Sequence, residues 1–328
     1  MLFAADFSPW FFRGLAFVFG AVWGSFFNVA IYRWPREMSV VHPPSHCTSC
    51  GAPVQVSKNV PIFGWLFLRG KTACCGAPLS GRYAVVETIT ALLCVAVVEQ
   101  FLVRAVPGTT LLAGAAEALV YFAFLGGLVI ATFVDLEWME IPDEVSLPGA
   151  ALGLATAALR TDPGTEAAAL GAGAGFLVIQ VLFVWSYEHL FGRRGMGEGD
   201  SKFLMFIGAF LGWKGAAFAL VGGAMQGVVA AGVLLATGRS LMPNVPEHER
   251  QGYEPETTTE KTETTKGMPA EDASDEAKNT EAEDDEAEDH DDSALKMPYG
   301  PFLALGAIEY LFFGDTILEW YFRILQGG

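Results

Sequence analysis

The sequence predicts an all-α polytopic membrane protein with about eight transmembrane segments and a small cytoplasmic cysteine-containing domain between the first two helices. Hydrophobic residues make up 52% of the 328 residues, and the mean hydropathy is +0.36. Apolar runs close to the roughly 20 residues that a helix needs to cross a bilayer recur along the chain. They lie at 10–33, 83–103, 111–134, 146–160, 167–191, 215–237 and 299–321, with a shorter run at 203–212.

The first apolar run is not expected to be a cleaved signal peptide, because it is too long and lacks a short basic start and an A-x-A-like exit. We expect it to be an uncleaved anchor in the lipid bilayer. The chain then divides into a first transmembrane helix (1–33), a cytoplasmic cysteine domain (34–81), a transmembrane bundle (82–237), an acidic linker (238–296) and a last transmembrane helix (297–328).

Lys and Arg residues near the ends of the apolar runs predict the orientation, because cytoplasmic loops carry an excess of positive charge. The loops at 33–82 and 192–202 are basic, whereas loops on the other side hold about one basic residue each. We therefore expect 33–82, 192–202 and the acidic stretch to face the cytoplasm. The loop 135–145 has no basic residue, and the number of helices alone places it on the same side. The basic residues concerned are Arg33, Arg36, Lys58, Arg69, Lys71, Arg82, Arg193, Arg194 and Lys202.

The acidic stretch at 246–292 accounts for most of the net charge. It holds 19 Asp and Glu against 4 Lys and Arg, and so contributes −15 of the formal net charge of −17. Its composition predicts a disordered cytoplasmic segment, either a solvated tether between two helices or an acidic docking tail. The remainder is nearly neutral, so no nucleic-acid partner is expected.

Four cysteines in the loop between the first two helices predict a metal site. Cys47 and Cys50 form a C-x-x-C pair, and the adjacent Cys74 and Cys75 follow about 24 residues later. Two such pairs folded together suit a tetrahedral zinc ion, and a cytoplasmic loop favours metal over a disulfide. Thr72 stands where a second C-x-x-C would begin, which leaves three thiolates with His46, His42 or water, an unmetallated loop, or a redox pair as alternatives. Cys94 is expected to be ordinary core.

Two aspartates at the ends of apolar segments predict an aspartyl dyad. Asp135 closes one long apolar run, and Asp200 follows three alternating glycines, Gly195, Gly197 and Gly199. Both fall at the cytoplasmic level, where two carboxyl groups can share a proton and activate water. The glycines would let the backbone approach a substrate closely. Separately, Asp200 is also interpretable as a helix N-cap and Asp135 as a solvated interface residue.

A set of motifs resembles one family. They are GSFFNVAIYRWP at 24–35, PPSHCTSCG at 43–51, NVPIFGWLFLRGK at 59–71, CGAPLSGRYAVVE at 75–87, Asp135 with IPDEVSLPG at 141–149, GMGEGDSK at 195–202 and YGPFLALGA at 299–307. The ordered set is similar to the prepilin peptidases (type IV leader peptidases), membrane aspartyl proteases of the GxGD type. It covers most of the chain outside 238–295.

The resemblance implies that Asp135 and Asp200 are catalytic, with Gly197, Gly199, Asp143 and Lys202 in supporting positions. It implies cleavage of type IV prepilins and type II secretion pseudopilins after the leader glycine, at the cytoplasmic face of the bacterial inner membrane. It also implies N-methylation of the new N-terminus with S-adenosylmethionine, around Gly70 and Lys71.

Three features depart from the family pattern. Thr72 replaces a family cysteine, Glu198 adds a charge beside Asp200, and the acidic insert is unusual.

Two functions of other classes are weighed against the peptidase. A proton-coupled transporter would place its acids near the middle of the bilayer and often shows repeated halves. A non-catalytic pilus assembly scaffold would tolerate loss of both aspartates.

Overall fold

The predicted all-α class is confirmed. The computed structural model describes residues 8–55, 58–160, 162–192, 196–237 and 297–325, which belong to one unit formed by Met1–Pro243 and Met297–Gly328. Within these ranges the regular structure is helical, and extended pairing is confined to isolated bridges between His46 and Pro53 and between Lys71 and Pro78. The predicted linker 238–296, with the predicted disorder of 246–292, lies outside the described residues.

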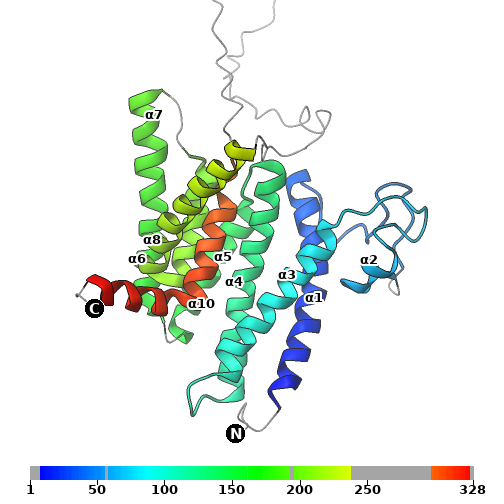
Figure 1. The fold of residues 1–328 in the computed structure, drawn as a ribbon, viewed down its shortest axis with the longest axis horizontal. Helices are drawn as coiled ribbons and strands as arrows, with labels where there is room; N and C mark the ends of the chain where they lie inside the picture. Colours follow the sequence, from blue (N-terminus) through cyan, green and yellow to red (C-terminus); the bar gives the residue numbers. More distant parts are fainter. Residues whose placement is uncertain (1–7, 56–57, 161, 193–195, 238–296, 326–328) are drawn as a thin grey trace, which may run out of the picture. The chain divides into compact units, whose positions relative to one another are not determined.

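In the described residues, seven long helices form the body of the unit (Figure 1). They are α1 (Pro9–Arg33), α3 (Arg82–Val98), α4 (Leu111–Trp138), α5 (Asp143–Thr156), α6 (Gly164–Leu177), α8 (Glu198–Thr237) and α10 (Gly300–Leu325). α2 (Phe63–Phe67) and α7 (Ser186–Phe191) are short. π-helical stretches extend α3 (Glu99–Val103) and join α6 to α7 (Val178–Trp185), and 3-10 turns follow α1 (Trp34–Arg36) and α5 (Ala157–Leu159).

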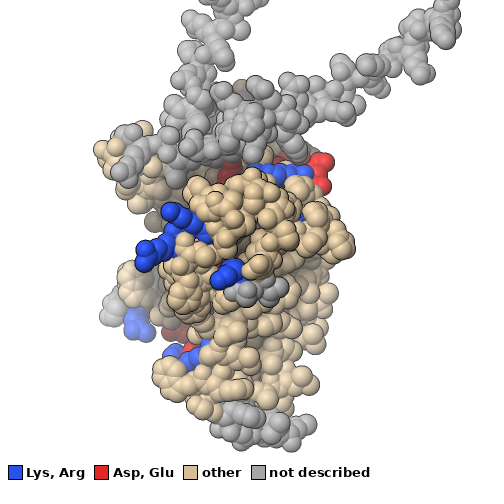
Figure 2. Space-filling view, turned by 90° about the vertical axis from the view of Figure 1, so that its right-hand side faces the viewer, with Lys and Arg blue, Asp and Glu red and all other residues tan. Residues whose placement is uncertain are grey.

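The helices make this a multi-span membrane protein. In the described part of the chain, 5 helical stretches are long and apolar enough to cross a membrane by length and composition. They are Pro9–Arg36, Arg82–Val103, Leu111–Trp138, Gly164–Phe191 and Glu198–Thr237, and Gly300–Gly314 is a shorter apolar helix. Figure 2 shows one side of the molecule, where uncharged residues cover most of the surface. The predicted run 146–160 corresponds to α5 and its following 3-10 turn, and the runs 203–212 and 215–237 both lie in α8.

α8 is broken at Gly212, as the separate apolar runs at 203–212 and 215–237 predict. Gly212 has φ 69° and ψ −177°, a conformation that essentially only glycine adopts. The half of α8 before the break is buried in the protein, where the Phe206 and Phe210 side chains are enclosed. The Phe210 ring stacks on Phe124 of α4 with centroids 4.5 Å apart. The short run therefore lies in the core and does not need to span the bilayer alone.

The break in α8 leaves backbone carbonyls without helical partners, and a buried arginine satisfies them. A helix end leaves its last carbonyls unpaired, and these carry partial negative charge. Arg160 is 4% exposed, and its guanidinium donates to the carbonyls of Phe210 at 2.6 Å and Ala209 at 3.0 Å. A further bond reaches Gly153 of α5 at 2.5 Å. Arg160 thus ties the loop after α5 to the kink in α8.

Replacing Arg160 tests this link. We expect Arg160→Met to lower the free energy of unfolding by roughly 2–4 kcal/mol, because buried carbonyls lose charged donors. The matched control is Arg104→Met, since Arg104 is 74% exposed and its ion pair with Glu99 contributes little. Thermal unfolding in detergent, followed by tryptophan fluorescence, measures both. Equal melting temperatures for the two variants would contradict the assignment.

Candidate active site

Asp135 lies in the last turn of α4 and is 5% exposed. The helix ends because Met139 adopts φ 56° and donates its N–H to the Asp135 carbonyl at 2.9 Å. The Asp135 carboxylate oxygen Oδ2 accepts the backbone N–H of Gly300, at the start of α10, at 2.8 Å. A Cβ on residue 300 would lie 2.7 Å from that oxygen, so only glycine allows this approach.

Asp200 lies in the first turn of α8 and is half-buried. The helix begins at Glu198, so Asp200 is its third residue and not its N-cap, as one interpretation of the sequence proposed. Its carboxylate accepts the backbone N–H of Gly197, in the manner of the acidic residue of a capping box. The helix therefore starts earlier than the apolar run alone indicates, and the carboxylate is held by the turn that carries the glycines.

The structure brings the two predicted catalytic aspartates together. Asp135 and Asp200 are near enough for their charges to repel each other. Tyr299 lies beside them, near enough for the charge of Asp200 to act on its hydroxyl. Its hydroxyl donates to the Leu220 carbonyl at 2.8 Å. Two carboxyl groups in such a site can share a proton, one accepting it from water while the other donates to a carbonyl or leaving group.

The turn between α4 and α5 fills the space behind the dyad. A Cβ on Gly199 would lie 3.3 Å from Ile141 Cβ, and one on Gly300 would lie 3.2 Å from Ile141 Cδ1. Ile141 is therefore packed between the starts of α8 and α10. Its side chain is 7% exposed, so this turn screens one side of the carboxylates from water.

Charged residues surround the turn between α4 and α5. Asp143 accepts two bonds from the Lys202 ammonium, at 2.6 and 2.8 Å, and so links α5 to α8. Partial removal from water and, after it, the like charges of Glu144, Asp143 and Glu37 raise the pKa of Glu140. The turn is thus acidic on its outer side, where a basic segment would be attracted. Supporting roles for Gly197, Gly199, Asp143 and Lys202 stay predictions.

An apolar cavity of about 330 Å³ lies between α1, α4, α5 and α8. Aromatic side chains dominate its lining, and Glu144 is the one carboxylate among the lining residues. Gly126, Gly127 and Gly149 also line it. The cavity has the chemical character of a site for an apolar segment.

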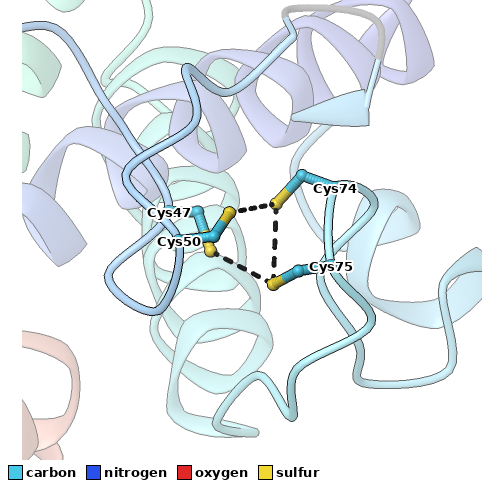
Figure 3. A group of neighbouring side chains, drawn as sticks. All are labelled: Cys47, Cys50, Cys74 and Cys75. Carbon is cyan, nitrogen blue, oxygen red and sulfur yellow. Dashed lines mark hydrogen bonds between the residues drawn. The ribbon is translucent and has the colours of Figure 1, made fainter.

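The four predicted metal ligands gather in one place (Figure 3). The sulfurs of Cys47, Cys50, Cys74 and Cys75 all lie within 4.8 Å of one another. Cys50 and Cys74 are 3.4 Å apart, Cys47 and Cys75 3.8 Å, and Cys74 and Cys75 3.9 Å. A tetrahedral site with Zn–S bonds of about 2.3 Å spaces its sulfurs about 3.8 Å apart. The spacing of the four sulfurs fits a tetrahedral zinc ion, and the adjacent Cys74 and Cys75 both belong to the cluster.

The two cysteine loops have the same backbone pattern, which explains the irregular second pair. Cys47 donates to the Ala52 carbonyl and accepts from Gly51, each at 2.8 Å. Thr72 repeats both bonds, donating to Ala77 at 2.8 Å and accepting from Gly76 at 3.0 Å. Thr72 therefore occupies the position of Cys47 in the second loop.

Cys74 supplies the thiol that Thr72 lacks, from two residues further along. The Thr72 hydroxyl is 3.3 Å from Cys75 Sγ. That hydroxyl, followed by the Ala77 N–H, lowers the pKa of Cys75. Backbone N–H groups of Cys50 and Ser49 lower the pKa of Cys47 to about 6. Both effects favour the thiolates that a metal requires.

Gly70 and Lys71 lie directly before the second cysteine loop. Gly70 has φ 68°, and a Cβ there would lie 3.2 Å from the Trp65 ring. Lys71 is exposed. A role for Gly70 and Lys71 in methyl transfer stays a prediction. Cys94 is 3% exposed and lies in the core, as predicted.

Sequence reasoning did not assign roles to Ile141, Tyr299 and Gly300. Ile141 lies in the IPDEVSLPG motif, and Tyr299 and Gly300 lie in the YGPFLALGA motif. Membership of these motifs was the one sequence feature that pointed to the three residues. Their contacts with the dyad join segments far apart in the chain, which spacing alone does not indicate.

Comparisons with known proteins agree with this arrangement. Residues 18–101, which include the cysteine cluster, match the bacterial peptidase A24 N-terminal domain. Residues 122–232, which include both aspartates, match the type IV leader peptidase family. No solved structure matches the chain significantly.

Curated relatives cover nearly all of the chain. A prepilin leader peptidase/N-methyltransferase of Aeromonas hydrophila is 31% identical over 95% of this chain and 94% of its own length. One of Myxococcus xanthus is 32% identical over 94% of this chain and 91% of its own length. One of Klebsiella pneumoniae is 34% identical over 65% of this chain and 90% of its own length. None of these matches supports a transporter or a scaffold, and the chain belongs to the type IV leader peptidase family.

Proposed function

We propose that this chain is a membrane aspartyl endopeptidase that removes the basic leader from type IV prepilins and type II secretion pseudopilins. The observation that carries the proposal is the pairing of Asp135, at the end of α4, with Asp200, at the start of α8, in a chain of this family. Gly300, at the start of α10, bonds the Asp135 carboxylate. Water held by the two carboxylates attacks the carbonyl carbon of the leader's terminal glycine. The ionised carboxylate takes a proton from the water, the protonated carboxyl group donates its proton to the leaving amide nitrogen, and the C–N bond breaks to release the mature N-terminus as an amine.

The surroundings of the dyad support a substrate with a basic leader and an apolar segment. The acidic turn with Glu140, Asp143 and Glu144 would attract the leader, and the aromatic cavity beside Glu144 would accept the apolar segment from the bilayer. The basic loops favour a cytoplasmic active site, and hence the bacterial inner membrane.

Methyl transfer to the new N-terminus is the second proposed activity. S-adenosylmethionine, when bound, supplies an electrophilic methyl group. The exposed Lys71 ammonium suits the cofactor's carboxylate, and the Trp65 indole beside Gly70 suits a flat or cationic group. These residues would hold the cofactor, while Trp65 Nε1 is fixed by donation to the Leu79 carbonyl at 3.1 Å.

Replacement of the aspartates tests the peptidase. We expect Asp135→Asn and Asp200→Asn each to lower kcat by at least about 1,000-fold, because an amide cannot exchange the proton. Glu166→Gln is the matched control, an exposed acid in the first turn of α6. Mass spectrometry of a prepilin incubated with each purified variant measures leader removal. Cleavage by both Asn variants at the wild-type rate would contradict the proposed catalytic role of Asp135 and Asp200.

The Gly300 contact gives a second prediction. A methyl group at residue 300 would press on Asp135 Oδ2, so we expect Gly300→Ala to lower kcat by roughly 10-fold or more while KM changes little. Gly173→Ala is the control, because a Cβ there meets nothing within 4 Å. The same mass-spectrometric assay, run over a range of substrate concentrations, separates the two constants. An effect on KM alone would place Gly300 in substrate binding instead.

The cysteine cluster is proposed to hold one zinc ion per chain through Cys47, Cys50, Cys74 and Cys75. We expect Cys74→Ala to lose most of the metal, and the double variant Cys74→Ala/Thr72→Cys to regain it, because Thr72 occupies the position of Cys47 in the second loop. Metal analysis of the purified protein gives the stoichiometry without reference to activity. Full zinc content in Cys74→Ala would exclude Cys74 as a ligand.

A further inference from the structure

The short helix α2 exposes a group of apolar side chains in the loop between α1 and α3. Phe63 is 49% exposed, Leu66 53% and Phe67 82%. The Phe63 and Phe67 rings, one helical turn apart, stack with centroids 6.2 Å apart. Exposed aromatic side chains gathered in this way mark an interaction surface. No helix of the described bundle covers them.

α2 lies beside α3 and not beyond its end. The backbone N–H of Ile62, the residue before α2, donates to Glu87 Oε2 at 2.6 Å. Glu87 is five residues into α3, which begins at Arg82. This places the Glu87 backbone about 7.5 Å along the helix axis, at a rise of about 1.5 Å per residue, and its side chain lies over the turn before it. Figure 1 shows α2 to the side of α1 and α3, lower than their upper ends.

The strained backbone of Ile62 and the buried Glu87 carboxylate attach α2 to the membrane helices. Ile62 has φ 65° and ψ −57°, which is unfavourable for a β-branched residue and persists only where neighbours enforce it. Its partner Glu87 is 6% exposed and packs on α1, since a Cβ on Gly24 would lie 2.7 Å from Glu87 Cα. The buried carboxylate therefore fixes α2 alongside the first two turns of a membrane-spanning helix.

The loop around α2 is positively charged. Residues 38–81 contain no Asp or Glu, while Lys58 precedes α2 and Arg69 and Lys71 follow it. All three side chains are exposed. Figure 2 looks onto the side from which this loop projects, and Lys and Arg lie there among uncharged residues. Apolar and cationic side chains thus share one surface.

We propose that residues 58–71 form an interfacial anchor that binds the surface of a bilayer containing anionic phospholipid. Phe63, Leu66 and Phe67 enter the boundary between headgroups and acyl chains, and Lys58 and Arg69 contact the lipid phosphates. Exposed phenyl rings beside cations, at the level of the first turns of a spanning helix, match this environment. An acidic protein would satisfy the cations but would not explain the depth of α2.

The anchor would also position the cysteine cluster. Trp65 of α2 contacts Gly70 and donates to Leu79, so α2 and the second cysteine loop move together. Residues 72–75 follow the anchor directly. The thiols are therefore held at the membrane surface and not on a free loop.

Photocrosslinking of the full-length protein in lipid nanodiscs tests the proposal. Phe67→p-benzoylphenylalanine is compared with Val41→p-benzoylphenylalanine, since Val41 is 69% exposed in the same loop but outside the anchor. In discs with anionic phosphatidylglycerol, the probe at residue 67 should attach to lipid at least fivefold more than the probe at 41. Attachment at 67 to a second protein copy, or a lipid yield equal to that at 41, would overturn the anchor.

The charges are tested in the same assay. Lys58→Gln combined with Arg69→Gln should lower the lipid yield at residue 67 at least twofold in anionic discs and leave it unchanged in discs of phosphatidylcholine alone. Arg323→Gln, at an exposed position near the end of α10, should change neither. An equal yield for wild type and the double variant in anionic discs would refute the role of the cations. Thermal unfolding of each variant confirms that the protein is folded.

Discussion

The hydrogen bond from the Gly300 N–H to Asp135 Oδ2 joins two segments 165 residues apart, and the arrangement of the dyad depends on it. It is buried, so water does not compete for the donor, and a bond to a carboxylate is stronger than one between neutral groups. It brings the start of α10 against the end of α4, which carries Tyr299 to Asp200 and encloses Ile141. The long acidic segment between α8 and α10 therefore does not separate the last helix from the catalytic bundle.

Much of this protein was predictable from local patterns. The apolar runs indicated the helices and the break near Gly212, because length and hydropathy are properties of a single segment. Asp135 and Asp200 were found because each ends or begins such a run within a recognisable motif. The roles of Gly300 and Ile141 were not predictable, since they arise from contacts between helices. The start of α8 was also missed, because Glu198 and Gly199 already adopt helical geometry before the apolar residues begin.

The cysteine loops show a different limit. If a strict C-x-x-C spacing is required, Thr72 is a lost ligand and the adjacent Cys74 and Cys75 can bind one ion only with strain. The structure keeps the backbone of the loop and moves the thiol two residues along, from position 72 to position 74. The position of the turn, set by the left-handed Gly51 and Gly76, is what the two loops share. Ligand geometry is thus determined by the turn, and spacing is only a usual consequence of it.

The two candidate sites are connected through the end of α4. Arg36, just after α1, lies over the Trp138 ring at 4.7 Å, and Arg82, at the start of α3, forms an ion pair with Glu137. These arginines flank the cysteine domain on both sides, and their partners follow Asp135 by two and three residues. The loop that is proposed to transfer a methyl group is therefore fixed at both ends to the last turn of α4, which carries Asp135. A peptide end released at the proposed dyad would emerge beside the domain that is proposed to modify it, so cleavage and methylation would need no separate encounter.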